Sequence, residues 1–174
     1  MDSLVRRLRK LYVAVMMRIV GWGLRAMSKV DPVVRAEAAG FPAGALIEMT
    51  VMPAGPGMVL ERRPDGTFAY LGTRPPRKAD LAVRFKHLSH AFAVLAFLES
   101  TPEAFARARM VVDGDISSGV RLVRCLYRLE TILLPKFIAR RGMKRYPADV
   151  TLGAKLATGA RVYGRIAADL VTRS

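Results

Sequence analysis

The chain has 174 residues, enough for one domain with a proper core and some terminal extension. Its hydrophobic content is 52% but its aromatic share only 7%, so the apolar mass is mostly aliphatic. The single cysteine, Cys125, excludes an intramolecular disulfide. Its place between Leu122 and Leu126 predicts an inert, packed thiol and a reducing compartment.

The formal net charge of +15 is concentrated at the two ends of the chain. Residues 1–30 hold seven basic residues and one acidic residue, and residues 134–174 hold nine and two. The intervening stretch is almost balanced, with thirteen basic and eleven acidic residues. Basic flanks on a nearly neutral body indicate an anionic partner, either lipid headgroups or nucleic acid. We expect residues 1–40 to form a basic amphipathic extension and residues 135–174 to form basic helices that pack on or flank the domain.

The first thirty residues predict one amphipathic helix. Its residues Arg7, Lys10, Arg18 and Arg25 share an arc of roughly 80°, with Ala14 and Gly21 between them, whereas Arg6 and Arg9 widen the basic region near the start. Its longest uncharged run, Leu11 to Met17, is far below the ~20 apolar residues of a membrane span. A secretory signal fits poorly, because arginines interrupt the apolar part. Two placements stay open: in the interface of an anionic membrane, or packed on the domain. The residues expected at the membrane are Arg6, Arg7, Lys10, Arg18, Trp22 and Arg25. The expected apolar side holds Val5, Leu8, Tyr12, Val15, Met16, Ile19 and Trp22.

The middle of the chain predicts five strands, because apolar and polar residues alternate in short runs bounded by turn residues. Before them, Asp31-Pro32 is expected to cap a short helix that continues to Ala39. Asp65-Gly66 supplies the turn of a hairpin. The expected strands are Ala45–Met52, Met58–Arg62, Thr67–Leu71, Asp80–Phe85 and Met110–Val112.

Helical patterns follow the fourth strand. His87 to Leu98 is almost wholly apolar and must be buried, and Thr101-Pro102 starts a short helix. Glu99 and Glu103 flank the turn between these helices, where we expect them to cap or to face water. From Ile116 to Leu134 the apolar period is again that of a helix. Further helices are expected at Lys136–Arg141 and Thr151–Thr172.

Signals for catalysis are weak throughout. The sequence lacks a nucleophile elbow, a phosphate-binding loop, a dinucleotide fingerprint and a Cys/His cluster. His87 and His90 share a helix face, but no third metal ligand is near in sequence. We therefore expect neither an enzyme nor a bound cofactor or metal.

Nucleic acid is not the partner that we expect. Arg121, Arg124 and Arg128 recur at helical spacing and could follow phosphates, although a solvated basic face is the commoner explanation. No stacking platform or known binding motif accompanies them.

Three stretches together resemble the sterol carrier protein-2 family of small lipid carriers. They are "GMVLERRPDGTFAYLG", "ADLAVRF" and "TPEAFARARMVVDGDISSGVRLVRCL". The order of elements also matches, from Ala45 to Leu134. The layout is nearest to the bacterial branch linked to ubiquinone synthesis, whereas the long basic C-terminal helix departs from the family.

The resemblance implies an α+β fold for residues 41–134, with a five-stranded, mostly antiparallel sheet covered on one face by helices. It also implies an apolar tunnel between the layers. From the residues alone, the inward side chains could instead fill a solid core. Those expected to contact a lipid are Leu81, Val83, Phe85, Leu88, Phe92, Leu95, Phe105, Met110, Val112, Val120, Val123 and Leu126.

The functional prediction is a non-catalytic carrier of a hydrophobic lipid, cytoplasmic and peripherally attached to anionic membranes. A sterol, an isoprenoid or quinone precursor, a fatty acyl chain and a phospholipid all remain open as ligands. The alternative is an accessory or scaffold protein with biosynthetic protein partners in a ubiquinone-type complex.

Overall fold

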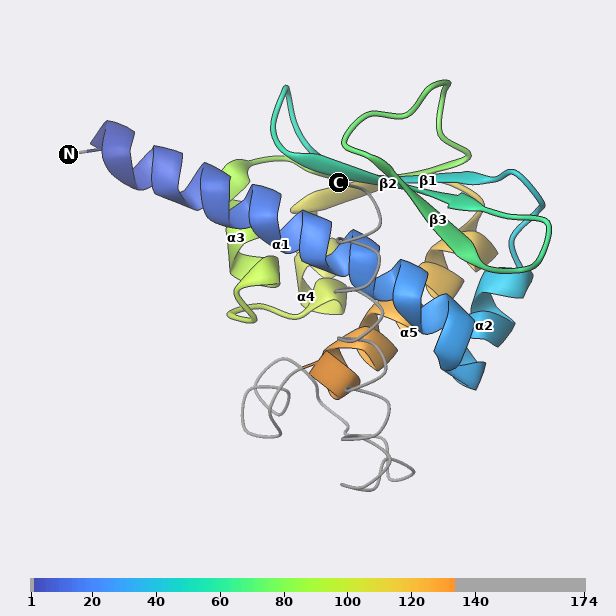
Figure 1. Cartoon of the computed structure of the whole chain (residues 1–174). Coiled ribbons are helices and arrows are strands. Elements are labelled where there is room, and N and C mark those ends of the chain that lie inside the picture. Colours follow the sequence, from blue (N-terminus) through green and yellow to red (C-terminus); the bar gives the residue numbers. More distant parts are fainter. Residues whose placement is uncertain (1, 134–174) are drawn as a thin grey trace, which may run out of the picture.

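The computed structural model describes residues 2–133 (Figure 1). The helices expected beyond Leu134 lie outside the described residues. The helices are α1 (Asp2–Val30), α2 (Pro32–Ala39), α3 (Leu88–Leu95), α4 (Thr101–Ala106) and α5 (Ile116–Leu133). The strands are β1 (Leu46–Val51), β2 (Gly57–Arg62), β3 (Phe68–Gly72), β4 (Leu81–Phe85) and β5 (Met110–Gly114).

The five strands form one sheet in the order β3-β2-β1-β4-β5. Three neighbouring pairs are antiparallel, and the central pair β1–β4 is parallel. The predicted α+β class and the mostly antiparallel sheet are therefore confirmed, with a parallel centre that the sequence did not reveal. Asp80 fixes this centre, because its carboxylate accepts the Leu46 N–H at 2.8 Å and its own N–H donates to the Leu46 carbonyl at 2.9 Å.

The helices lie together on one side of the sheet, and α1 runs across strands β2 and β3 (Figure 1). Period-two alternation turns Ile47, Met49 and Val51 of β1 into the core. Cys125 of α5 is also buried, and burial raises the pKa of its thiol to about 12. The predicted inert cysteine is thus confirmed.

Helix α1 buries a face different from the one expected. The fully buried residues of α1 include Val13, Met17, Leu24 and Met27. They follow one another at three-, four- or seven-residue intervals, which place them on one side of the helix. Gly21 does not lie among exposed basic residues: it packs on β3, where a Cβ atom would come within 2.6 Å of the Tyr70 ring. The prediction failed because apolar residues occur on more than one side of α1, so periodicity alone did not show which side meets the sheet: Met17 and Leu24 are buried, whereas Ile19 remains exposed.

Helix α2 begins where the sequence predicted. The Asp31 carboxylate accepts the N–H groups of Val33 and Val34 at 3.0 Å, and Pro32 occupies the first turn. This cap satisfies two of the donors that a helix start leaves open. The other carboxylate oxygen of Asp31 accepts from Arg128 Nε at 3.0 Å and so ties α2 to α5.

The arginine edge of α5 is paired with acidic residues on and beside α2. Arg121 and Arg124 each donate to Glu37 of α2 at 3.1 Å, and Arg128 pairs with buried Asp31. These arginines are therefore ion-paired, although Arg124 is still 61% exposed. The sequence hid the acidic partners because they lie more than eighty positions away.

The turn after α3 also differs from expectation. Helix α3 ends at Leu95 instead of Leu98, because Phe97 adopts a left-handed φ of 59° and reverses the chain. Glu99 neither caps nor faces water: its side chain is 5% exposed and pairs with Arg107 at 3.2 Å and Arg109 at 2.7 Å. These two pairs join the end of α3 to the α4–β5 connection.

Candidate binding cavity

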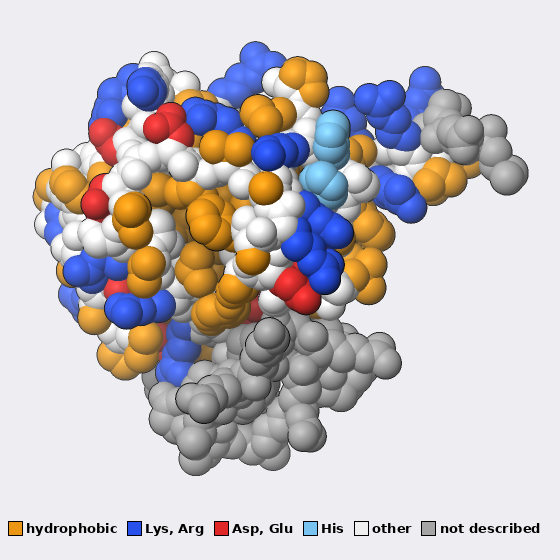
Figure 2. Space-filling view, turned by 180° about the vertical axis from the view of Figure 1, so that it is seen from behind, with side chains coloured by type: hydrophobic (Ala, Val, Ile, Leu, Met, Phe, Trp, Pro, Cys, Tyr) orange, Lys and Arg blue, Asp and Glu red, His pale blue; other side chains and the backbone are white. Residues whose placement is uncertain are grey.

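A cavity of about 760 Å³ lies between the sheet and the helices α1, α4 and α5. Seen from the side opposite to Figure 1, hydrophobic side chains gather around a hollow in the middle of this face (Figure 2). The volume falls in the range of small-molecule sites, ≈ 300–1,000 Å³. The helices therefore do not close completely on the sheet.

Three neighbouring strands form the floor of the cavity. Met49 of β1 lies opposite Val83 of β4, and Val83 lies opposite Val112 of β5. Phe85 and Met110 are paired in the same way further along the strands. Because alternate residues of a strand share a face, all five point to the helix side. The floor is thus wholly apolar.

The rim of the cavity is built by residues that remain partly open to solvent. Phe105 of α4 is 58% exposed, and Ile116 and Val120 at the start of α5 are 82% and 45% exposed. All three line the cavity. Exposed apolar side chains of this size around an apolar hollow mark a surface suited to a hydrophobic ligand.

Nine of the twelve residues that the sequence singled out lie on the cavity wall. They are Val83, Phe85, Leu95, Phe105, Met110, Val112, Val120, Val123 and Leu126.

The other three, Leu81, Leu88 and Phe92, do not line it. Leu81 is 1% exposed within the core, although its partner on β5, Gly114, lines the cavity. Phe92 faces α1 instead, with its ring 5.2 Å from that of Tyr12 and beneath the Arg9 guanidinium. Leu88, also on α3, packs against the core. The sequence pattern predicted that α3 is an apolar helix, but it did not show which element each face of this helix contacts.

Sequence reasoning missed the contribution of α1 and the polar end of α5. The helical spacing of Met16, Ile19 and Val20 was a usable signal, but we expected α1 either at a membrane or packed on the domain, and not as a wall of a cavity. The lining residues outside the prediction are Met16, Ile19, Val20, Met49, Val94, Phe97, Thr101, Pro102, Gly114, Ile116, Gly119, Leu122, Arg124, Tyr127, Leu129 and Glu130.

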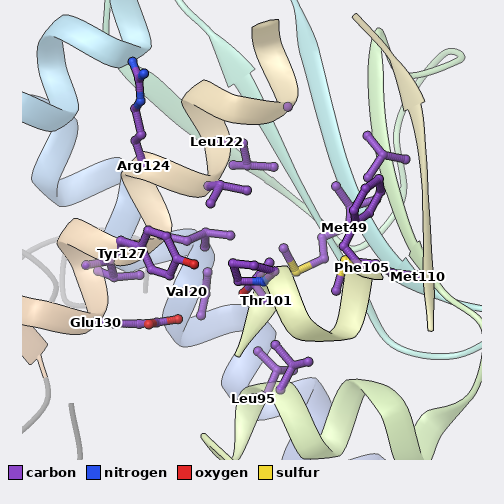
Figure 3. A pocket seen from close by; sticks show the side chains of 18 of the residues that line it. Val20, Met49, Leu95, Thr101, Phe105, Met110, Leu122, Arg124, Tyr127 and Glu130 are labelled. Carbon is purple, nitrogen blue, oxygen red and sulfur yellow. The ribbon is translucent and has the colours of Figure 1, made fainter. Parts of the chain in front are cut away.

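One end of the cavity is polar. Tyr127 and Glu130, one turn apart on α5, extend into it, and Thr101 at the start of α4 lies on the same side (Figure 3). Burial raises the pKa of Glu130 to about 7, and burial together with the Glu130 charge raises the pKa of Tyr127. Arg124 also borders the cavity but points away from it, toward Glu37 of α2 (Figure 3).

Residues 2–133 contain no cluster of three or more His, Cys, Asp or Glu side chains that could hold a metal ion. The rings of His87 and His90 lie 5.2 Å apart on the molecular surface near α3. Over the same residues, no helix combines the length and the apolar character that a membrane crossing requires.

Comparisons with known proteins found similar solved structures, whereas no family model and no curated protein matches the chain. A ubiquinone synthesis protein named UbiJ-SCP2 is 17% identical, with a TM-score of 0.47 over 69% of this chain and 96% of that one. Sterol carrier protein 2 from Yarrowia lipolytica, in its apo form, is 15% identical, with a TM-score of 0.41 over 64% and 91%. A protein from Thermus thermophilus, described as possibly a sterol carrier protein, is 16% identical, with a TM-score of 0.45 over 74% and 90%. The descriptions of these three structures name SCP2 or a sterol carrier protein.

Proposed function

We propose that the protein is a non-catalytic carrier that holds a hydrophobic lipid in the cavity. The observation that carries the proposal is the continuous apolar floor of β1, β4 and β5 beneath a hollow of about 760 Å³. Burying a lipid tail of ~300 Å² at ~25 cal/mol per Å² gains about 7 kcal/mol before association costs.

The test of the carrier role is displacement of a fluorescent fatty probe, together with native mass spectrometry of the gently purified protein. Val120→Trp should fill the rim of the cavity and weaken binding by about tenfold or more. Val33→Trp is the matched control, because Val33 lies on α2 outside the cavity with a similar exposed fraction of 42% against 45%. Equal binding by both variants, or no lipid bound by the parent protein, contradicts the proposal.

We further propose that α1 docks the carrier on anionic membranes. Its first turns leave Leu4, Leu8 and Leu11 about 60% exposed, beside the exposed basic residues Arg6 and Arg7. In Figure 1 this end of α1 extends beyond the sheet.

Val15 and Ile19 continue the exposed apolar row along α1, and Ile19 lines the cavity. A lipid leaving the bilayer along this row would therefore reach the hollow directly.

The six expected membrane residues divide into two groups. Arg6, Arg7, Lys10 and Arg18 are exposed, as docking requires. Trp22 and Arg25 are half-buried: the Trp22 ring packs 5.4 Å from Tyr70, and the Arg25 guanidinium lies 4.9 Å from the Trp22 centroid. The first group is therefore the one to mutate.

Vesicle flotation tests the docking. Each basic residue near an anionic surface adds roughly 1 kcal/mol, so the charge-reversed variant of Arg6, Arg7 and Lys10 should lose binding to phosphatidylserine vesicles. Reversal of Arg63, Arg74 and Lys78, which are exposed in loops on the sheet side, is the control with the same net charge. Removing residues 1–28 is not a usable test, because α1 supplies part of the core. Equal loss in both variants would show that only net charge matters and would refute docking through α1.

The accessory role in a ubiquinone-type complex remains a prediction from the family resemblance. Pull-down with prenyl-lipid enzymes is the measurement that addresses it. The case for nucleic acid is weaker than the sequence suggested, since the arginine edge of α5 is engaged by Asp31 and Glu37.

A further inference from the structure

One end of the cavity carries polar groups that a plain hydrocarbon could not hydrogen-bond. Tyr127 and Glu130 extend from α5 into the same space, and Thr101 lies across from Tyr127 (Figure 3). The remaining lining side chains are apolar apart from Arg124, which is held by Glu37. A lipid lying on the apolar floor would therefore meet polar atoms at one end only.

These polar groups have no protein partner among the residues that the structure describes. Within residues 2–133, neither the Glu130 carboxylate nor the Tyr127 hydroxyl takes part in a hydrogen bond or an ion pair. The Glu130 side chain is half-buried, and burial raises the pKa of its carboxyl, so a donor that satisfied the carboxylate would offset part of the cost of burying its charge. The parts of α5 that face α2 show the opposite pattern, because every arginine there meets an acidic residue. The two polar groups of α5 without a partner among the described residues, the Glu130 carboxylate and the Tyr127 hydroxyl, thus both lie at the cavity.

We infer that this polar end receives an uncharged hydroxyl head group, so that the preferred ligand is a lipid alcohol and not a free fatty acid. This inference rests on the proposed carrier function. A hydroxyl both donates and accepts, so it can donate to an ionised Glu130 and accept from Tyr127 or from a protonated Glu130.

Other head groups fit less well. A carboxylate or phosphate head only accepts, and it would lie beside an ionised carboxylate with no cation of residues 2–133 free to compensate at the cavity, since Arg124 is paired with Glu37. An ammonium head only donates, and it loses its counter-charge whenever Glu130 is protonated. The raised pKa of Glu130, about 7, means that both of its protonation states occur near neutral pH. Among these head groups, only a hydroxyl can hydrogen-bond to Glu130 in both protonation states without an opposing charge.

The experiment compares hexadecanol, hexadecanoic acid and hexadecylamine, which share one chain length, in displacement of a fluorescent probe at pH 7, where both protonation states of Glu130 occur. The parent protein should bind the alcohol about tenfold more tightly than the acid. Glu130→Gln should remove most of this preference, because the amide no longer repels an anionic head. Tyr127→Phe should weaken the binding of the alcohol without strengthening the binding of the acid. This second variant tests the inference if Glu130→Gln does not fold.

Glu48→Gln is the matched control, since Glu48 lies on β1 outside the cavity. Equal binding of the three probes, with no effect of Glu130→Gln, would overturn the inference and leave the carrier function intact. Tighter binding of the acid or the amine would overturn it as well. Failure of the parent protein to bind any of the three would refute the carrier function itself.

Discussion

The same sheet is closed in one half and hollow in the other. Over β2 and β3, α1 lies directly on the strands, and Met58, Phe68 and Tyr70 are buried beneath it. Over β4 and β5, the corresponding space is the cavity. The difference is not one of hydrophobicity, since both halves present apolar strands. The two halves differ in the distance between the helices and the strands.

Two local features set this distance. Gly21 allows α1 to approach the Tyr70 ring on β3 more closely than any side chain would permit. On the other side, α5 is held by α2, because three arginines of α5 pair with Glu37 and Asp31. Helix α5 therefore packs on other helices and remains away from the strands beneath it. The following predictions alter one half or the other.

The largest expected effect comes from Asp31→Ala. Asp31 is 2% exposed, caps α2 and pairs with Arg128, whose side chain is 18% exposed. Removing one partner of a buried ion pair costs about 3–5 kcal/mol. Urea unfolding should therefore show a large loss of stability, and probe binding in the cavity should change because α5 loses an attachment.

Asp113→Ala is the control for this change. Asp113 pairs with Arg84 at 3.4 Å, with side chains 50% and 30% exposed, so its loss should cost at most about 1 kcal/mol. Similar losses for the two variants would mean that the α2–α5 contact does not set the position of α5.

Gly21→Ala tests the closed half. An alanine Cβ would lie 2.6 Å from the Tyr70 ring, which is itself packed against Trp22. Overpacking costs about 1–3 kcal/mol, and the gain of up to ~1 kcal/mol from helix propensity offsets part of it. We expect a net loss of about 1–2 kcal/mol in thermal or urea unfolding. Ala14→Val, two turns earlier on the same face and half-exposed, should be nearly neutral; a stabilised Gly21→Ala would contradict the close approach.

The hollow half should make stability depend on pH through Glu130. Its carboxyl pKa is raised to about 7 from its ordinary value of 4.5, so the folded protein holds this proton more tightly than the unfolded chain. The penalty for burying the charge is absent below pH 4.5, grows as the pH rises through this interval and is complete above about pH 7.

Glu130→Gln should remove the penalty. Because the carboxylate borders a partly open cavity, we expect the variant to be about 1–2 kcal/mol more stable than the parent at pH 8 and no more stable at pH 4.5. Denaturant unfolding at both pH values measures this. A constant difference between the two proteins across the range would show that Glu130 titrates normally.

Much of the closed framework could be predicted from the sequence. Period-two alternation and the Asp65-Gly66 turn gave all five strands to within two residues, and Asp31-Pro32 gave the start of α2. These features depend on neighbouring residues, and local patterns record them. The nine predicted residues that line the cavity follow for the same reason, since each lies on the apolar face of its own element.

What could not be predicted depends on how distant segments meet. Phe92 lies on an apolar helix, but its contact with Tyr12 is set by the position of α1. The pairing of Glu99 with Arg107 and Arg109 depends on the reversal at Phe97, where a residue other than glycine takes a left-handed φ. No local pattern reveals such contacts.

The smallest expected effect is that of Gly119→Ala, which is the counterpart of Gly21→Ala in the hollow half. A Cβ atom on Gly119 would meet only Val112 Cγ1, at 3.7 Å, an ordinary contact. The helix propensity of alanine should therefore dominate and stabilise the protein by about 0.5–1 kcal/mol. If α5 is separated from the sheet by the cavity, thermal unfolding should show changes in stability of opposite sign for the two variants: a loss for Gly21→Ala and a gain for Gly119→Ala. A loss of stability at Gly119 would show that the cavity closes over Val112 in solution, and it would remove the space on which lipid binding depends.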